Sequence, residues 1–230
     1  MKTIICIPGL GGRANLFNKY KGSFPGFNIK TLDVIAWQEA QAKVDQMLAD
    51  ETEGVIFFCS CYGAQFALRA MEKYPVKTEA LIVVEPFFME FVWWRKIGYF
   101  LNNLVLLIIR GTHAIGLGRS KFKEVDYNMV EKQPLFFQPF YDISHQGSKD
   151  YFEKLKDIAT FKLPPKVETK TLFIFSPRGF MRGLKKRARL QKIFINGDYI
   201  ELGPNSHTIV TLAFQDITTA IKKWIGENLK

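Results

Sequence analysis

The residues best placed to do chemistry lie between Gly54 and Tyr74, where two cysteines and a serine interrupt an apolar run. The run before them predicts a buried strand, and the pattern after them predicts a helix that Pro75 ends. A side chain on such a strand-to-helix turn is exposed at the edge of a sheet. The segment therefore predicts a nucleophile elbow, whose chemistry is attack on a carbonyl carbon through a covalent intermediate.

Residue size identifies Cys61 as the nucleophile of this turn. An elbow needs small residues two positions before and two positions after the reactive residue. Around Ser60 both positions hold an aromatic side chain, whereas around Cys61 they hold Cys59 and Gly63. We expect the positive end of the following helix to favour the thiolate of Cys61. The alternative is a buried strand and an ordinary turn with two structural cysteines.

The elements that would position this turn are apolar strands alternating with helices. Strands are expected at residues 2–7, 28–34, 55–59, 80–84, 171–175 and 198–202, and helices at residues 37–50, 64–74 and 208–228. This order predicts an α/β fold with a mostly parallel sheet and flanking helices. The core would comprise residues 1–86 and 166–230, and the aromatic-rich residues 87–165 would form an inserted helical lid.

Length and cysteine content narrow the class of protein. A chain of 230 residues fits one domain with an inserted lid. No secretory signal is recognised, and three cysteines make neither a disulfide framework nor a zinc site. We therefore expect a cytoplasmic protein without a metal or a cofactor. The longest apolar stretch, residues 97–109, is too short to span a bilayer.

Three motifs, in the right order, make the chain resemble the α/β-hydrolase family. Residues 8–12, Pro-Gly-Leu-Gly-Gly, are similar to the family's oxyanion loop, with Pro8 where histidine is usual. The elbow at Cys61 is the second motif, and His207, just after the last expected strand, is the third. The resemblance covers nearly the whole chain outside the lid. It implies an α/β-hydrolase fold with a trimmed N-terminus that lacks the family's first two strands.

The resemblance also implies a role for each of these residues. His207 would accept the proton of Cys61 or hold it in an ion pair. The backbone N–H groups of Leu10 and Tyr62 would form an oxyanion hole. A histidine in a loop, bonded to solvent or backbone, is the alternative interpretation of His207.

The third catalytic residue is left open by the sequence. The family usually takes an acid from the loop after the strand 171–175, but residues 176–197 contain no Asp or Glu. Certain lipases take it instead from the end of the preceding strand, where this chain has Glu85. A carboxylate there could fix the imidazole tautomer. The alternatives are Asp198, a dyad of Cys61 and His207, or a protein without activity.

A cysteine nucleophile indicates an activated acyl substrate. Dienelactone hydrolases and polyhydroxyalkanoate synthases, the cysteine-using members that the elbow resembles, attack such groups. Acyl transfer between two thiols is nearly isoenergetic, which favours a thioester. The chain is shorter than a synthase, and Cys59 replaces the first glycine of the elbow. The expected activity is that of a hydrolase or acyltransferase, thioesterase-like, acting on an ester or thioester of a hydrophobic acyl group.

Aromatic residues at the start of the expected lid predict an apolar wall for an acyl chain. Phe87, Trp93 and Trp94 are the candidates. Ordinary packing of the lid on the core explains them equally well. The two tryptophans are followed by Arg95 and Lys96, a pattern that also fits peripheral contact with a membrane surface.

A basic segment late in the chain predicts an anionic partner. The net charge of +10 comes from the middle and late segments, and residues 171–230 hold ten basic and four acidic side chains. One stretch has seven basic residues and no acid: Arg178, Arg182, Lys185, Lys186, Arg187, Arg189 and Lys192. The phosphates of coenzyme A, an acyl carrier protein, anionic lipid or plain solvent could face it. Nucleic acid is not expected, because stacking aromatics are lacking.

Arg178, Arg182, Lys185 and Lys186 are the anion-binding candidates within that stretch. The second hypothesis for the whole protein is a catalytically inactive hydrolase-like module. Such a module would bind an acyl chain, an acyl carrier protein or an anionic membrane surface.

Overall fold

The computed structural model describes residues 1–9, 14–32, 34, 37–88, 153, 156–177, 184–203, 210 and 213–229. The chain divides into two compact units, Met1–Phe87 with Leu163–Lys230, and Phe88–Lys162. Most of the expected lid lies outside the described residues, so its helical character stays a prediction. The strands and helices named below all belong to the first unit.

Six parallel strands form one sheet in the described part of the chain. They are β1 (Thr3–Ile7), β2 (Asn28–Thr31), β3 (Val55–Ser60), β4 (Thr78–Val84), β5 (Lys170–Phe175) and β6 (Gly197–Glu201). Their order across the sheet is β2-β1-β3-β4-β5-β6, and every neighbouring pair is parallel. The expectation of a mostly parallel sheet with flanking helices is confirmed. Because the strands are parallel, their carboxyl ends share one edge, where such sheets bind ligands.

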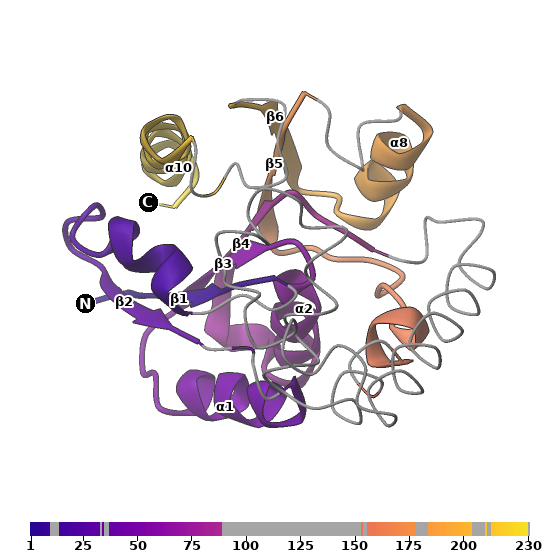
Figure 1. The fold of residues 1–230 in the computed structure, drawn as a ribbon, viewed down its shortest axis with the longest axis horizontal. Helices are drawn as coiled ribbons and strands as arrows, with labels where there is room; N and C mark the ends of the chain where they lie inside the picture. The colour runs from indigo at the N-terminus through magenta and orange to yellow at the C-terminus, as the bar shows by residue number, and fades with distance from the viewer. Residues whose placement is uncertain are drawn as a thin grey trace, which may run out of the picture. The chain divides into compact units, whose positions relative to one another are not determined.

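Helices cover both faces of this sheet (Figure 1). They are the 3₁₀ helices η1 (Ala14–Tyr20) and η2 (Pro75–Lys77) and the α-helices α1 (Trp37–Ala49), α2 (Gly63–Lys73), α8 (Leu184–Ile193) and α10 (Phe214–Asn228). Figure 1 shows η1 and α10 on one face and α1, α2 and α8 on the other. No helix within the described ranges has both the length and the apolar character needed to cross a bilayer.

Burial explains why the central strands are continuous apolar runs. All six residues of β3 are buried, as are all five of β1, because helices pack on both faces. The edge strands β2 and β6 are half-exposed and contain polar residues. On the face covered by η1 and α10, Phe58 packs against Phe17 and Tyr20, and Ile217 and Ile221 complete the core.

Two element boundaries differ from the expectation. The last helix, expected over residues 208–228, is interrupted at Ala213, whose backbone angles are non-helical (φ −106°, ψ 33°), so α10 begins at Phe214. The second strand ends at Thr31 rather than at Val34, because pairing with β1 stops there. Of the expected apolar stripe of the last helix, Ile217 and Ile221 are buried as predicted.

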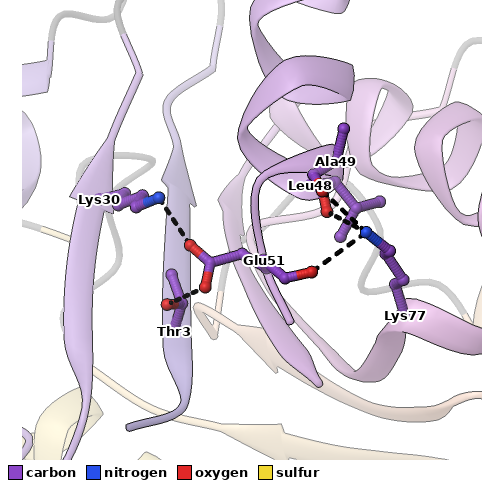
Figure 2. A network of polar contacts seen from close by, with 6 residues as sticks. All are labelled: Thr3, Lys30, Leu48, Ala49, Glu51 and Lys77. Atoms are coloured by element: carbon purple, nitrogen blue, oxygen red, sulfur yellow. Dashed lines mark hydrogen bonds and ion pairs between the residues drawn. The ribbon is translucent and has the colours of Figure 1, made fainter. Parts of the chain in front are cut away.

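The amino-terminal edge of the sheet is held by a polar network centred on Glu51 (Figure 2). One carboxylate oxygen accepts a hydrogen bond from Thr3 Oγ1 at 2.8 Å, and the other lies 2.6 Å from Lys30 Nζ. The Lys30 ammonium, through its hydrogen bond, and the Thr3 hydroxyl hold the pKa of Glu51 below its ordinary value, against the opposite effect of burial. Glu51 therefore links β1 to the edge strand β2.

Lys77 closes the end of α1 at the same edge (Figure 2). Its ammonium donates to the carbonyl oxygens of Leu48, Ala49 and Glu51 at 3.1, 2.9 and 3.1 Å. The last carbonyls of a helix have no partner within the helix, so a cation there both satisfies them and complements the helix dipole.

Candidate active site

Cys61 follows the last residue of β3 and has the backbone expected of an elbow. Its φ angle is 50°, in the left-handed region that L-residues other than glycine rarely adopt. Its N–H donates to the carbonyl of Val84 at 2.9 Å, so the conformation is fixed by the neighbouring strand. The residue is half-buried, at the carboxyl edge of the sheet.

Gly63 lets the helix after the elbow begin against the end of β1. A Cβ atom at this position would lie 2.4 Å from the carbonyl oxygen of Ile7 and 2.6 Å from that of Pro8. Both distances are shorter than any real contact of this kind, and both partners are backbone atoms. The small residue that the elbow pattern requires after Cys61 thus has a steric cause.

The loop that follows β1 passes directly beside Cys61. A Cβ atom on Gly9 would lie 2.9 Å from Cβ and 3.7 Å from Sγ of Cys61. The expected oxyanion loop and the thiol are therefore neighbours. Leu10, the predicted donor in this loop, lies outside the described residues, so its role stays a prediction.

Cys61 differs from the other two thiols in its exposure. Cys6 and Cys59 are fully buried in strands of the sheet, whereas Cys61 is half-buried. Burial raises the pKa of the Cys6 thiol and of the Cys59 thiol well above the ordinary value. Neither buried thiol is suited to nucleophilic attack.

Tyr62 and Phe87 lie side by side next to the elbow. Tyr62 is the N-terminal cap residue of α2, and its N–H is the second predicted oxyanion donor. Its ring lies 4.8 Å, centroid to centroid, from the ring of Phe87, a predicted substrate contact. The other predicted substrate contacts, Trp93 and Trp94, lie outside the described residues.

Glu85 stands at the end of the strand next to that of Cys61. Ser60 and Val84 are register partners, so Cys61 and Glu85 follow one another across the sheet edge. Glu85 also has a left-handed backbone, with φ 51°, and its N–H donates to Ile174 at 2.8 Å. It is 5% exposed.

The carboxylate of Glu85 is directed toward the end of β5. Its Oε1 accepts a hydrogen bond from the backbone N–H of Ser176, the first residue after that strand. Ser176 begins the loop in which the α/β-hydrolase family usually has its acid. In this chain the backbone N–H of Ser176 instead holds the carboxylate of Glu85. A buried carboxylate at this edge lies between the elbow and the last strand of the sheet.

Asp198, the alternative acid, is placed unfavourably. It is the second residue of β6, at the amino end of the strand, and its Oδ2 accepts the indole N–H of Trp224 at 2.6 Å. The elbow lies at the opposite edge of the parallel sheet. This position argues against Asp198 as a partner of Cys61.

His207 lies outside the described residues, but the chain on both sides of it is described. After β6, the N–H of Leu202 donates to Phe175 at 2.8 Å, and Gly203 turns with φ 79°. The segment that contains His207 thus starts at the carboxyl edge. It ends near Val210, whose carbonyl oxygen accepts a hydrogen bond from the Tyr20 hydroxyl at 2.6 Å.

The described half of the basic segment forms α8. Arg187 is bonded to Glu201 at 2.7 Å and lies over the ring of Phe175, so it fastens the helix to the sheet. Burial lowers the pKa of Lys186. Lys185 belongs to the helix, but its side chain is not described, and Arg178 and Arg182 lie outside the described residues.

Sequence reasoning misses three buried polar residues near this edge: Tyr20, Gln65 and Ser176. Tyr20 resembles any core aromatic in the sequence, and no periodic pattern marks it. Gln65, four residues after Cys61, is fully buried, and among the described residues neither of its side-chain amide atoms has a hydrogen-bond partner. Ser176 does carry a signal, because it is a small polar residue directly after an apolar strand. Within the described ranges, no three His, Cys, Asp or Glu side chains are grouped to hold a metal ion.

Comparison with known proteins gives a match in structure but not in sequence. No protein-family model matches the chain, and no curated protein matches it. MGS-M2, an α/β hydrolase enzyme from a Medee basin deep-sea metagenome library, has a TM-score of 0.68 at 15% identity, covering 98% of this chain and 89% of its own. Human thioesterase 2 gives 0.62 at 13% identity, covering 100% and 98%.

A third similar structure is the enol-lactonase from Burkholderia xenovorans LB400. Its TM-score is 0.65 at 12% identity, and the match covers 98% of this chain and 91% of the lactonase. At this level of identity the likeness establishes the fold. The chain has the α/β-hydrolase fold, and its elbow strand, β3, lies at the centre of the sheet.

Proposed function

We propose that the protein is a hydrolase or acyltransferase that acts on an ester or thioester of a hydrophobic acyl group through Cys61. The observation that carries the proposal is the left-handed backbone of Cys61 at the tip of the elbow, beside Gly9. Strained residues of this kind persist where the surrounding structure holds them, and they cluster at active sites. The fold supports the same class, since it is shared with a thioesterase and a lactonase.

The proposed reaction has two steps. The Cys61 thiolate attacks the acyl carbon and a C–S bond forms. The bond from the acyl carbon to the alcohol or thiol of the substrate breaks, and this leaving group takes a proton from His207. Water or a second acceptor then gives a proton to His207, attacks the thioester and releases the acyl group from Cys61. The N–H groups of Leu10 and Tyr62 would stabilise the oxyanion in both steps.

In this proposal Glu85 orients His207 and stabilises its cationic form. Its support is the position of the carboxylate, held by the Ser176 N–H at the end of the neighbouring strand. Glu85→Gln keeps an oxygen acceptor for that N–H but removes the charge. The expected result is a fall in kcat of roughly a thousandfold with an unchanged fold, because the wrong histidine tautomer is then favoured. An unchanged kcat would support the dyad instead.

The proposed substrate class is based on the aromatic and basic residues that the sequence suggests as its contacts. Phe87 lies beside Tyr62, and together with Trp93 and Trp94 it would contact the acyl chain. Arg178, Arg182, Lys185 and Lys186 would bind the phosphates of coenzyme A or the acidic face of an acyl carrier protein. Peripheral contact with a membrane is a further proposal that rests on the adjacent residues Trp93, Trp94, Arg95 and Lys96.

Intact-mass measurement with a panel of acyl thioesters tests the proposed function. The chain is expected to gain the mass of one acyl group, and Cys61→Ala is expected to gain none. His207→Ala should accumulate the adduct, because water is then no longer activated for its release. If neither the wild type nor His207→Ala forms an adduct or releases thiol from any thioester, the catalytic proposal is wrong and a binding module is favoured.

A further inference from the structure

Tyr20 contacts both the strand that leads to Cys61 and Val210, which lies three residues after His207. The proposed mechanism requires Cys61 and His207 to keep a fixed separation. The side chain is fully buried at the end of η1. Its hydroxyl donates to the carbonyl oxygen of Val210 at 2.6 Å. Burial, reinforced by the nearby Cys6 thiol, raises the pKa of Tyr20 well above its ordinary value, so the hydroxyl remains a donor across the working range of pH.

The ring of Tyr20 is fixed against the strand that carries the nucleophile. It meets the ring of Phe58 edge-on at 5.0 Å between centroids, and Phe58 lies three residues before Cys61 on β3. On its other side it meets Phe214, the first residue of α10, at 4.8 Å. Aromatic pairs in these arrangements resist displacement, because the ring edges and faces attract.

Val210 lies three residues after His207 and is itself buried. Three residues span about 11 Å at most, so a fixed carbonyl at Val210 limits where the segment before it can run. The only other described anchor of that segment is at its start, where Leu202 and Gly203 leave β6. The bond to Tyr20 thus secures the second end of the segment.

We infer that Tyr20 is a positioning residue for His207, holding the end of the histidine segment at a fixed place relative to the strand of Cys61. The inference rests on the proposed function, in which His207 exchanges a proton with Cys61. Tyr20 contacts neither substrate nor reacting atoms in this role. It acts through the Val210 carbonyl, and its removal would let the imidazole move away from the thiol.

Tyr20→Phe removes the hydroxyl and keeps the ring in its packing. Tyr199→Phe is the matched control. The hydroxyl oxygen of Tyr199 is buried with no hydrogen-bond partner among the described residues, and its ring, half-exposed on the edge strand β6, stacks against Phe173 at 5.2 Å. For a misplaced base we expect kcat to fall roughly ten- to hundredfold in Tyr20→Phe with little change in KM. Tyr199→Phe is expected to match the wild type.

The decisive readout is the pH profile of Cys61 alkylation by iodoacetamide, followed by intact mass, which needs no substrate. A thiol paired with an imidazole reacts at lower pH than an isolated thiol. The wild type and Tyr199→Phe are expected to share one profile, and the profile of His207→Ala is expected to lie at higher pH. Tyr20→Phe is expected to move toward the His207→Ala profile.

The outcomes separate the two proposals. If the wild type and His207→Ala have the same profile, the histidine does not pair with the thiol, and the proposed function loses its base. If those two differ and Tyr20→Phe follows the wild type, the positioning role is wrong while the proposed function stands. The NMR titration of the His207 imidazole, assigned with His207→Ala, gives the same test, because a merely structural effect of Tyr20 leaves that curve unchanged.

Discussion

Two residues at the candidate site hold backbone conformations that cost free energy. Cys61 and Glu85 have φ angles of 50° and 51°, whereas the other left-handed residues in the described part are the glycines at 22, 26 and 203. Each such residue costs about 1–3 kcal/mol and persists only when its surroundings impose it. Both are held by N–H bonds to the next strand. At the scale of single residues, the strained backbone positions are those of the proposed nucleophile and the proposed acid.

Replacing Cys61 by glycine and by alanine measures this strain. Neither variant has a thiol, so both are expected to be inactive. Glycine adopts the left-handed region without cost, and we expect Cys61→Gly to be more stable than Cys61→Ala by about 1 kcal/mol in urea unfolding. The control position is Gln46, an exposed residue within α1. There the expected order of stability is reversed, and Gln46→Gly is expected to be about 1 kcal/mol less stable than Gln46→Ala. The same order at both positions would show that Cys61 is unstrained.

Replacing Gly63 and Gly226 by alanine is expected to change the stability of the protein in opposite directions. Gly63→Ala forces a Cβ against the backbone oxygens of Ile7 and Pro8, and we expect a loss of about 1–3 kcal/mol of stability. Gly226 lies within α10, and a Cβ atom added there would meet no other atom within 4 Å. Gly226→Ala is therefore expected to stabilise the protein by about 0.5–1 kcal/mol. Thermal unfolding followed by circular dichroism measures both, and a stable Gly63→Ala would contradict the close packing of the elbow.

At the scale of elements, the two edges of the sheet differ in kind. The carboxyl edge carries Cys61 and Glu85, whereas the amino edge carries ion pairs and helix caps around Glu51 and Lys77 (Figure 2). Parallel strands bring about this separation, because all of them begin at one edge and end at the other. The stability of the sheet and the proposed chemistry are therefore served by different residues.

The contribution of Glu51 is expected to depend on pH. Lys30 and Thr3 contact its carboxylate, the N-terminal ammonium adds an attraction, and the pKa is held below the ordinary value of 4.5. A depressed folded-state pKa contributes stability above the ordinary value, and this contribution is lost as the pH falls below it through the folded-state pKa. Glu51→Gln is thus expected to be less stable than the wild type at neutral pH, with the difference disappearing as the pH falls through the folded-state pKa.

Urea unfolding at a series of pH values measures this difference. Glu39→Gln is the control, because Glu39 forms only an exposed pair with Lys43 within one helix. Such pairs contribute about 0.2–0.5 kcal/mol. A difference for Glu51→Gln that persists unchanged at low pH would mean that the effect is steric rather than electrostatic.

The sequence is sufficient to predict those strands and helices that produce a pattern among neighbouring residues. Each of the six expected strand segments overlaps one of the six strands, although only the inner ones are apolar throughout or nearly so. The size rule around Cys61 is explained by the close approach of Gly63 to β1. The apolar spacing does not reveal the break before α10, because that spacing continues through Ala213 although Ala213 has non-helical backbone angles. The 3₁₀ helix η1 has no periodic signal. The Tyr20–Val210 bond joins residues 190 apart, and no local pattern can reveal it.

At the scale of the whole molecule, the three thiols should be distinguishable by a single reagent. Cys6 and Cys59 are fully buried in the sheet, with raised thiol pKa values, and Cys61 is partly exposed. We expect iodoacetamide to add one group to the native chain, none to native Cys61→Ala, and three to the chain in urea. Intact mass measures these numbers directly. Rapid native labelling of two thiols would mean that the sheet opens readily.

The fold as a whole is shared by proteins with different activities. Proteins of this architecture include a thioesterase and a lactonase, at 12–13% identity to the chain. A fold supports many reactions, and the residues at its carboxyl edge select among them. At this edge the described part of the chain presents a thiol, a buried carboxylate and the aromatic pair of Tyr62 and Phe87.

The polar contacts of Glu51 and Lys77 at the amino edge of the sheet have a consequence for directed evolution. Glu51 and Lys77 tie β1, β2 and α1 together at the edge away from the elbow. If the carboxyl-edge loops determine specificity as proposed, we expect the scaffold to tolerate their replacement. Selection for heat resistance would enrich substitutions at one end of the strands, and selection for new substrates would enrich them at the other. Heat resistance and substrate range are therefore expected to evolve nearly independently when each library is confined to one end of the strands.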